Sequence, residues 1–168
     1  MTSTYSHNLR LELIAPGEQS NTWGNTTNVN LGSLLEQAIT GDTAVDVTLA
    51  DVTLLALNGA SDQARNMIIT ATGTPSVPRN VFCPDGVSKV YVFVNQTAQP
   101  VTFSTVSGTG VTVVGGNSAF LYCDGTNVNA CTIPTYTPNR AVATNASGYA
   151  QASSVTSTEL SYLSGVTS

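Results

Sequence analysis

Hydrophobic side chains recur along this chain with two different spacings, and the spacing changes near residue 41. In residues 8–14, apolar and polar side chains alternate, which predicts a half-buried strand. The apolar members of that strand are Leu9, Leu11 and Leu13. Residues 28–40 instead carry apolar side chains at helical spacing, which predicts an amphipathic helix of about three turns. The segment 1–41 is therefore expected to hold one strand and one short helix.

Residues suited to capping bound the predicted helix. Asn30 fits the start, Ser33 with Glu36 fits a capping box, and Gly41 follows the last apolar position. The apolar side chains of the helix are Leu31, Leu34, Leu35 and Ile39. A polar loop before it contains Trp23, which has two interpretations: it packs the loop onto the rest of the domain, or it anchors a contact with another protein.

From residue 44 the period of the apolar side chains becomes two, and turn sequences recur about every ten residues. Short strands are predicted at 45–49, 52–57, 66–72, 80–83, 89–95, 101–104, 109–114, 118–123 and 127–132. Asp124 and Gly125, between the last two strands, predict a hairpin with a type I′ turn. This pattern predicts an antiparallel β-sandwich or jelly-roll-like domain over residues 42–132. Alternation assigns four aromatic side chains to its core: Tyr91, Phe93, Phe120 and Tyr122.

Residues 133–168 have few large apolar side chains, and they predict a linker or extended segment that needs a partner chain to become ordered. Residues 156–159 offer helix-capping chemistry near the end of this segment. Leu160, Tyr162 and Leu163 follow, and so short a stretch cannot bury these side chains by itself. They are expected to pack against another chain.

Composition supports a β-rich fold and excludes some partners. Charged residues make up 9% of the 168 residues, against about 25% in an ordinary soluble domain. The net charge is −5 and the few basic residues are scattered, which argues against binding nucleic acid. No apolar run approaches the roughly 20 residues that span a bilayer, and residues 1–10 lack the features of a signal peptide. We therefore expect neither nucleic-acid binding nor membrane insertion, and synthesis in a cytoplasm.

The sequence offers few residues for catalysis or metal binding. It contains a single histidine, His7, and none of the common hydrolase, metalloprotease or nucleotide-binding motifs. Three aspartates that could suggest a calcium site match no EF-hand spacing, and surface solvation explains them better: Asp42, Asp46 and Asp51. The dispersed carboxylates also argue against a glycosidase. We expect no enzymatic activity, no metal and no cofactor.

Three cysteines are present: Cys83, Cys123 and Cys131. Their odd number and wide spacing argue against a zinc site. Buried thiols in or beside strands are the favoured interpretation, and a Cys83–Cys123 disulfide stays open.

Three stretches, in order along the chain, resemble structural proteins of tailed bacteriophages. Residues 8–41 are similar to the N-terminal part of many phage fibre and virion proteins, where a strand precedes GExxxTWGxxxNxNL and LLExAIxG. The runs NGASDQARNMIITATGT, SKVYVFVNQT and SAFLYCDGTNV resemble the β-rich domain that follows there. The closing SVTSTELSYLSGVTS is similar to TELxYLxGVTS units of fibre shafts. The resemblance covers nearly the whole chain.

The resemblance implies a structural component of a virion: the virion-proximal anchoring part of a homotrimeric tail fibre, assembled in the bacterial cytoplasm. Residues 1–41 would dock on another virion protein (a tail nozzle, adaptor, baseplate or capsid protein), 42–132 would form the β-domain, and 133–168 would begin the shaft. A downstream tip could reach the host cell surface. The docking side chains would be Leu9, Leu11, Leu13, Trp23, Leu31, Leu34 and Leu35, and the trimeric stalk would use Leu160, Tyr162 and Leu163.

Three other functions stay open at this point. A head or neck fibre or a capsid-decoration protein would use the same domain elsewhere on the particle. A carbohydrate-binding module that recognises the host would need clustered exposed aromatic side chains, whereas alternation assigns those of this chain to the core. A polysaccharide depolymerase would need two carboxylates converging in a groove.

Overall fold

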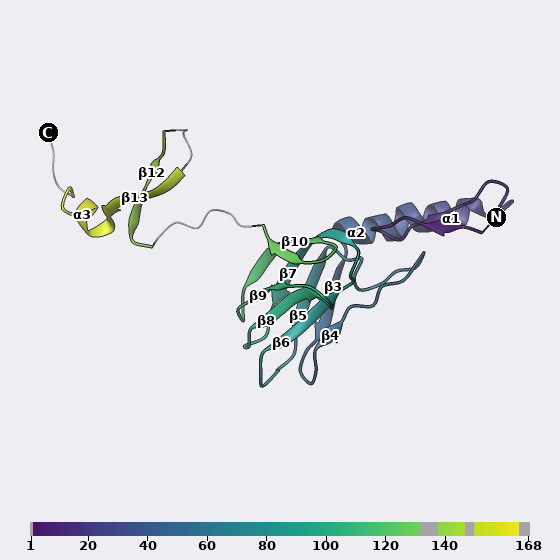
Figure 1. Ribbon diagram of the computed structural model, residues 1–168, viewed down its shortest axis with the longest axis horizontal. Helices are drawn as coiled ribbons and strands as arrows, with labels where there is room; N and C mark the ends of the chain where they lie inside the picture. Colours follow the sequence, from purple (N-terminus) through teal and green to yellow (C-terminus); the bar gives the residue numbers. More distant parts are fainter. Residues whose placement is uncertain (1, 132–137, 147–149, 165–168) are drawn as a thin grey trace. The chain divides into compact units, whose positions relative to one another are not determined.

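The computed structural model describes residues 2–131, 138–146 and 150–164 (Figure 1). The chain is mainly β, with 39% of residues in strands and 15% in helices, which confirms the predicted fold class at that level. It divides into two compact units, Met1–Cys131 and Thr132–Ser168, which we call unit 1 and unit 2.

Unit 1 contains two main sheets. The five-stranded sheet has the order β11-β10-β7-β5-β3, and its strands are Val128–Ala130, Ser118–Asp124, Ser88–Asn95, Ile68–Thr72 and Asp42–Asp46, respectively. The four-stranded sheet has the order β4-β6-β8-β9, and its strands are Val52–Thr53, Arg79–Cys83, Val101–Thr105 and Gly110–Val113, respectively. Each of the nine strands predicted beyond residue 44 has a counterpart here, although β4 is much shorter than predicted.

From β3 to β8 the chain alternates between the two sheets, so that odd-numbered strands lie in one sheet and even-numbered strands in the other. Each strand therefore runs parallel to the one two places earlier, as the pairs β3–β5, β5–β7, β4–β6 and β6–β8 do. Antiparallel pairs occur at β8–β9, β7–β10 and β10–β11. The expectation of purely antiparallel pairing is wrong, because hydrophobic period reports which face is buried and carries no information about strand direction.

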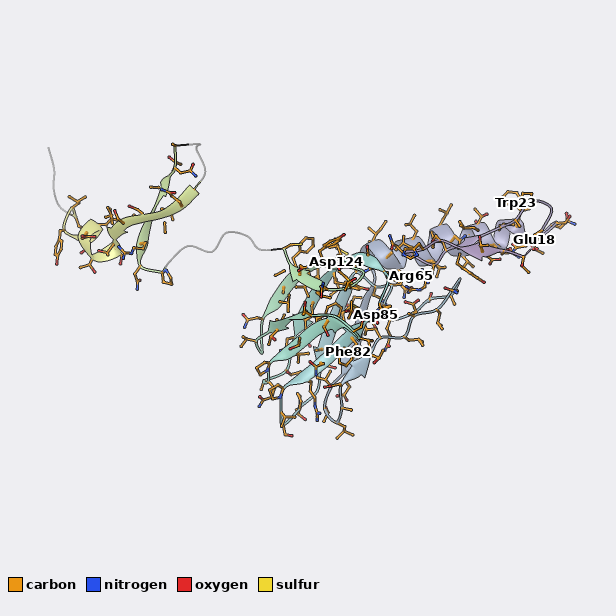
Figure 2. The ribbon with its side chains drawn as sticks, viewed as in Figure 1. Glu18, Trp23, Arg65, Phe82, Asp85 and Asp124 are labelled. Atoms are coloured by element: carbon orange, nitrogen blue, oxygen red, sulfur yellow. The ribbon has the colours of Figure 1, made fainter. Side chains whose placement is uncertain are left out.

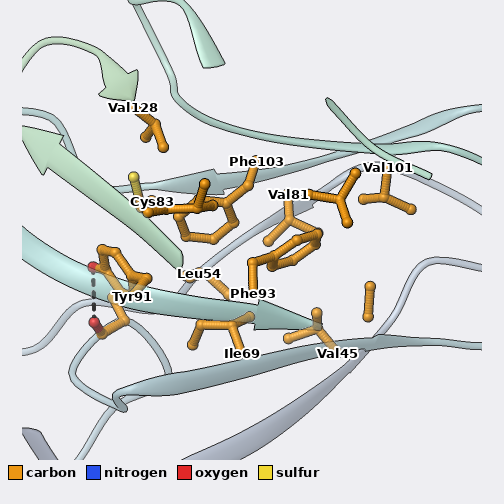
Figure 3. Close-up of a cluster of buried hydrophobic side chains, with 14 of the residues drawn as sticks. Val45, Leu54, Ile69, Val81, Cys83, Tyr91, Phe93, Val101, Phe103 and Val128 are labelled. Carbon is orange, nitrogen blue, oxygen red and sulfur yellow. Dashed lines mark hydrogen bonds between the residues drawn. The ribbon is translucent and has the colours of Figure 1, made fainter. Parts of the chain in front are cut away.

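Both sheets contribute to one hydrophobic core (Figure 3). Tyr91 and Phe93 on β7 meet Phe103 on β8, with ring centroids 5.1 and 4.9 Å from that of Phe103. The Tyr91 hydroxyl donates a hydrogen bond to the carbonyl oxygen of Ala64 at 3.0 Å, which satisfies the one polar group of this ring. Smaller aliphatic side chains fill the space around the rings, among them Val45, Ile69, Val81, Val101 and Leu121.

The predicted hairpin at Asp124 is confirmed, but its turn is not type I′. A type I′ turn needs positive φ at both central residues, and here Gly125, with φ of 97°, is followed by Thr126, whose φ is not positive. The Asp124 carboxylate accepts the backbone N–H groups of Thr126 and Asn127 at 2.8 and 2.7 Å. These bonds lower the pKa of Asp124, and they fix the conformation of the turn.

The helix of unit 1 begins earlier than predicted. It runs without a break through α1 (Trp23–Val29), a π-helical turn η1 (Asn30–Leu35) and α2 (Glu36–Thr40), which makes it about 27 Å long. Asn30, Ser33 and Glu36 lie inside it, so the predicted N-terminal caps at these residues are wrong.

Gly41 does end the helix, as predicted, and the space around it has no room for a side chain. A Cβ at Gly41 would lie 2.3 Å from the carbonyl oxygen of Gln37 and 2.5 Å from Oδ1 of Asn66. The backbone turns there into an extended conformation and enters β3 at once.

The predicted strand at 8–14 is mostly replaced by a small hairpin of β1 (Thr4–Tyr5) and β2 (Glu12–Leu13). Arg10 interrupts the strand because its φ is 52°, in the left-handed region that extended chains avoid. Leu9 and Leu11 are half-buried and Leu13 is exposed, so the strict alternation of the sequence is lost.

Cys83 on β6 and Cys123 on β10 are buried thiols in opposite sheets, with sulfur atoms 3.9 Å apart. That distance is a hydrogen-bonding contact and not a covalent bond. The hydrogen bond and burial raise the pKa of Cys83, so its thiol stays protonated. Cys131 is exposed.

Unit 2 holds more regular structure than the predicted extended segment. Strands β12 (Arg140–Thr144) and β13 (Ala150–Thr156) form an antiparallel hairpin, followed by the short helix α3 (Ser157–Ser161). The capping prediction is confirmed, since Thr156 and Glu159 form a complete capping box. None of the described side chains of this unit is buried.

Candidate docking surface

The helix and the arm before it form the most unusual surface of unit 1. We call residues 2–22 the arm and, with the helix 23–40, the arm–helix. The helix extends from the end of the sheets, and the arm returns along its side (Figure 1). Figure 2 shows Trp23 near the end of the helix that is remote from the sheets.

Polar side chains fix the arm to the helix. Asn30 uses both ends of its amide group, accepting the N–H of Glu12 at 3.2 Å and donating to its carbonyl oxygen at 2.8 Å. The backbone N–H and carbonyl groups of Glu12 thus gain the two hydrogen bonds that a neighbouring strand would otherwise provide. Gln19 joins the two parts as well, since its amide donates to Glu12 at 2.7 Å and accepts the Thr26 hydroxyl at 2.5 Å.

With polar groups making these contacts, large apolar side chains of the arm–helix face solvent. Leu13, Trp23 and Leu31 are 51%, 61% and 59% exposed. Other exposed apolar side chains of the arm–helix are Tyr5, Val29 and Ile39. Contiguous exposed apolar surface is typical of sites of association, so this region is the candidate docking surface.

The structure sorts the predicted docking side chains into three groups. Leu13, Trp23 and Leu31 are exposed and available for contact, and Leu9, Leu11 and Leu35 are half-buried. Leu34 is fully buried, so it supports the fold of unit 1 and is not available to a partner. Sequence spacing gave Leu31, Leu34 and Leu35 equal weight because all three fit a helical stripe. Tyr5, Val29 and Ile39 are exposed as well, and they were not among the candidates drawn from the sequence.

The buried carboxylate of Asp62 is the charged centre of the contacts between the arm–helix and the β-domain, which also include bonds of Arg10 with Leu57 and of Asn8 with Ser88. It accepts Nη2 of Arg10 from the arm at 2.8 Å and Nη2 of Arg65 at 3.2 Å. Backbone N–H groups of Leu57 and Arg65 also donate to it, at 2.8 and 2.6 Å. The Asp62 and Arg65 side chains are both completely buried, so each compensates the charge of the other.

Further bonds around Asp62 hold α2 in place. Gln37 on α2 donates its amide to the carbonyl oxygen of Asp62 at 3.0 Å, and Asn66 donates to the same oxygen at 2.9 Å. Lys89 donates to the carbonyl oxygen of Asn66 at 2.7 Å and lies 4.0 Å from the centre of the Tyr91 ring. Burial lowers the pKa of Lys89 to about 8. These bonds set the direction in which the helix leaves the sheets.

The basic side chains of unit 1 are all engaged with oxygen atoms of their own chain. Arg79 donates to the backbone carbonyl oxygens of Thr48 and Leu49, and Arg10, Arg65 and Lys89 make the contacts given above. Acidic side chains such as those of Asp42 and Asp85 are exposed. Among the described residues of unit 1, exposed acidic side chains therefore outnumber basic side chains that are free of contacts with their own chain.

A second apolar surface lies on the outer face of the five-stranded sheet. It includes two aromatic side chains that were predicted to lie in the core. Tyr91 and Phe93 are buried in the core as expected, but Phe120 and Tyr122 are 50% and 42% exposed. On β10 it is Leu121 and its neighbour Cys123 that point into the core. The expectation that all four aromatic side chains are internal is therefore wrong for two of them.

The described residues include no cluster of side chains suited to a metal ion. Within residues 2–131, 138–146 and 150–164, no group of three or more His, Cys, Asp or Glu side chains is placed to hold a metal ion. Asp46 and Asp51 make local hydrogen bonds instead, Asp46 with the N–H of Thr48 and Asp51 with Asn80. No helix in the described ranges is long and apolar enough to cross a bilayer.

The predicted stalk residues are exposed in unit 2. Leu160, Tyr162 and Leu163 lie on and just after α3 and are 45%, 75% and 63% exposed. Val142 and Val155 of the hairpin are exposed too.

Comparison with known proteins gives no relative: no family model, no curated protein and no solved structure matches this chain.

Proposed function

We propose that this chain is a non-enzymatic structural component of a tailed-phage virion, the anchoring part of a homotrimeric tail fibre. Residues 1–41 dock on another virion protein, 42–132 form a sandwich-like β-domain, and 133–168 lead into the shaft. The observation that carries the proposal is the arm–helix, which presents Leu13, Trp23 and Leu31 to solvent. The ordered resemblance of three sequence stretches to phage proteins supports it.

The exposed side chains of unit 2 support the trimeric part of the proposal. Leu160, Tyr162 and Leu163 are 45–75% exposed, and burying the rest of their apolar surface against symmetry copies would stabilise a stalk by about 1 kcal/mol or more per side chain. The capping box at Thr156 starts α3 at a defined residue, so the copies would present these side chains in register.

Incorporation into virions tests the docking role. Trp23→Ala and Leu31→Ser each remove an exposed apolar side chain, and Asn28→Ala alters an exposed position of the same helix as the matched control. A hot spot contributes about 2 kcal/mol or more, which corresponds to roughly 30-fold weaker binding. We expect the first two variants to be depleted from purified particles, measured by quantitative mass spectrometry, and the control to be retained. Normal copy numbers for both variants would refute docking through this surface.

The same docking surface serves a head or neck fibre or a capsid-decoration protein, and a cryo-EM map of the virion distinguishes these from a tail fibre by position. A carbohydrate-binding function is the candidate of another class, and the exposed pair Phe120 and Tyr122 favours it, because aromatic rings stack on sugars. Binding to host-surface glycans on an array, lost in Phe120→Ala, would support that function.

A further inference from the structure

The outer faces of the two main sheets differ in chemistry. On the four-stranded sheet the outward side chains include Phe82 together with Asn80, Thr102 and Thr112, and the two threonine hydroxyls share a hydrogen bond of 2.8 Å. On the five-stranded sheet one row of apolar side chains crosses three adjacent strands, and Ser118 and Thr70 lie in the row beside it. The five-stranded sheet therefore has the more continuous apolar outer surface.

We call this apolar surface the sheet face, and strand register defines it. Phe120 on β10 lies opposite Val92 on β7, which lies opposite Ile68 on β5. Tyr122 lies opposite Val90 in the next row. The neighbouring residues Tyr91, Phe93, Ile69 and Leu121 point into the core, so the residues of the sheet face point outward. Val94 extends the face by one more position on β7.

The chemistry of the sheet face suits a protein surface better than a sugar or an anion. Valine and isoleucine side chains offer no hydrogen bonds for sugar hydroxyls, and the centre of the face has no charged residue. Asp42 on β3 lies at the edge of the sheet face, opposite Ile68 on β5, and Asp124 lies at the end of β10. Flat apolar sheet faces pack well on one another at a separation of about 10 Å.

The path of the chain indicates which molecule covers the sheet face. The N–H of Cys131, the last residue of unit 1, donates to the carbonyl oxygen of Phe120 at 2.9 Å, so the chain leaves unit 1 beside the sheet face. Only residues 132–137 separate it from Pro138 of unit 2. If three copies of unit 2 associate, this short connection keeps three copies of unit 1 at millimolar effective concentration.

We infer that the sheet face is an interface between copies of this chain, in which three sheet faces meet around the axis of the trimer. The inference rests on the proposed homotrimer and adds the surface through which unit 1 takes part in it. Phe120 and Tyr122 are its central side chains, covered on each copy by the valine and isoleucine side chains of the neighbours.

Photo-crosslinking of the full chain tests this interface. A benzophenone amino acid replaces Phe120 in one variant and Thr112 in the control, where it stands on the outer face of the other sheet. After irradiation, covalent oligomers are measured by denaturing electrophoresis and the crosslinked peptides by mass spectrometry. We expect position 120 to link to residues 88–95 or 118–124 of another copy, and position 112 to give no link between copies. Native mass spectrometry of the same samples reports the oligomeric state.

The outcomes separate this inference from the proposed function. A trimer without links between copies from position 120 would overturn the sheet face as interface and leave the fibre assignment intact. A monomer at micromolar concentration would overturn both the interface and the homotrimer, whereas virion incorporation would still report docking. Binding of a host glycan to the sheet face of an unlinked chain would assign the face to recognition instead.

A double variant gives an independent measure. Phe120→Ser with Tyr122→Ser should stay folded, because both rings are half exposed, and circular dichroism checks this. Loss of two hot-spot rings should weaken association of the copies by roughly 30-fold or more. An association constant within threefold of the wild type, in a folded variant, would contradict the inference.

Discussion

Removing the Asp62 carboxylate tests the connection between arm–helix and β-domain most directly. In Asp62→Ala the guanidinium of Arg65 stays fully buried without its counterion, and Arg10 loses its partner at 2.8 Å. Breaking a buried ion pair from one side costs about 3–5 kcal/mol. That is a large share of the roughly 5–15 kcal/mol that stabilises a typical domain. We therefore expect Asp62→Ala to be strongly destabilised.

Two further variants separate the charge from its hydrogen bonds. Asp62→Asn keeps an acceptor for the N–H of Arg65 but loses the charge, so we expect an intermediate loss of about 2 kcal/mol. Asp42→Asn removes one charge from an exposed position, and we expect a change within about 0.5 kcal/mol.

Urea unfolding followed by far-ultraviolet circular dichroism gives the three free energies of unfolding, and hydrogen exchange reports opening of the arm. Exchange in residues 2–22 should rise in Asp62→Ala and also in Arg10→Ala, which removes the bonds of the Arg10 side chain to Asp62 and Leu57 and leaves the Asp62–Arg65 pair in place. If Asp62→Ala lost less than about 1 kcal/mol, as little as the exposed control, the buried ion pair would not be the connection we describe.

Three more predictions follow from the described side chains. The pKa of Lys89, about 8 in the folded chain against its usual 10.5, means that the folded chain binds fewer protons between these values, so the free energy of unfolding should rise with pH. Relative to Lys89→Met, urea titrations should show a gain of about 1–3 kcal/mol from pH 8 to 10, and a flat difference would contradict it. Of the thiols, Cys131 should react at once with Ellman's reagent, while Cys83 and Cys123 should react only after unfolding; three fast thiols would refute their burial. Trp23→Ala should change stability by less than about 0.5 kcal/mol, because the ring is largely exposed, and a loss above 2 kcal/mol would assign it to the core.

Strand positions were predictable from the sequence because apolar period and turn residues act locally. Strands β5 to β11 lie within a few residues of their predicted ranges. Their direction was not predictable, since whether β5 pairs with β3 or with β4 depends on the crossovers between sheets. The capping box at Thr156 was foreseen for the same local reason.

The surface of β10 shows where the alternation rule fails. Phe120, Leu121, Tyr122 and Cys123 are all apolar or amphipathic, so period two does not say which pair faces inward. The long side chains suggested the aromatic pair, but the space beneath β10 is already occupied by rings from β7 and β8, and the smaller pair fits there. Leu34 is the converse case, a predicted docking residue that became buried.

Arg10 failed as a strand residue because a turn stands at its position, where its N–H donates to the carbonyl oxygen of Ser6. Its side chain also contacts the carboxylate of Asp62, 52 residues away. A period-based prediction has no access to a contact of that separation.

The alternation of strands between the two sheets also determines how such a domain can change in length. One circuit of the chain, such as β5 followed by β6, adds a strand to each sheet and continues the inward rows of both. An inserted or deleted circuit would therefore leave the remaining pairs in register, as in solenoid proteins that grow by whole repeats. A single inserted strand would instead reverse the sense of all later ones. The unit of variation in this architecture is thus a two-strand coil, and related chains should differ in length by multiples of it.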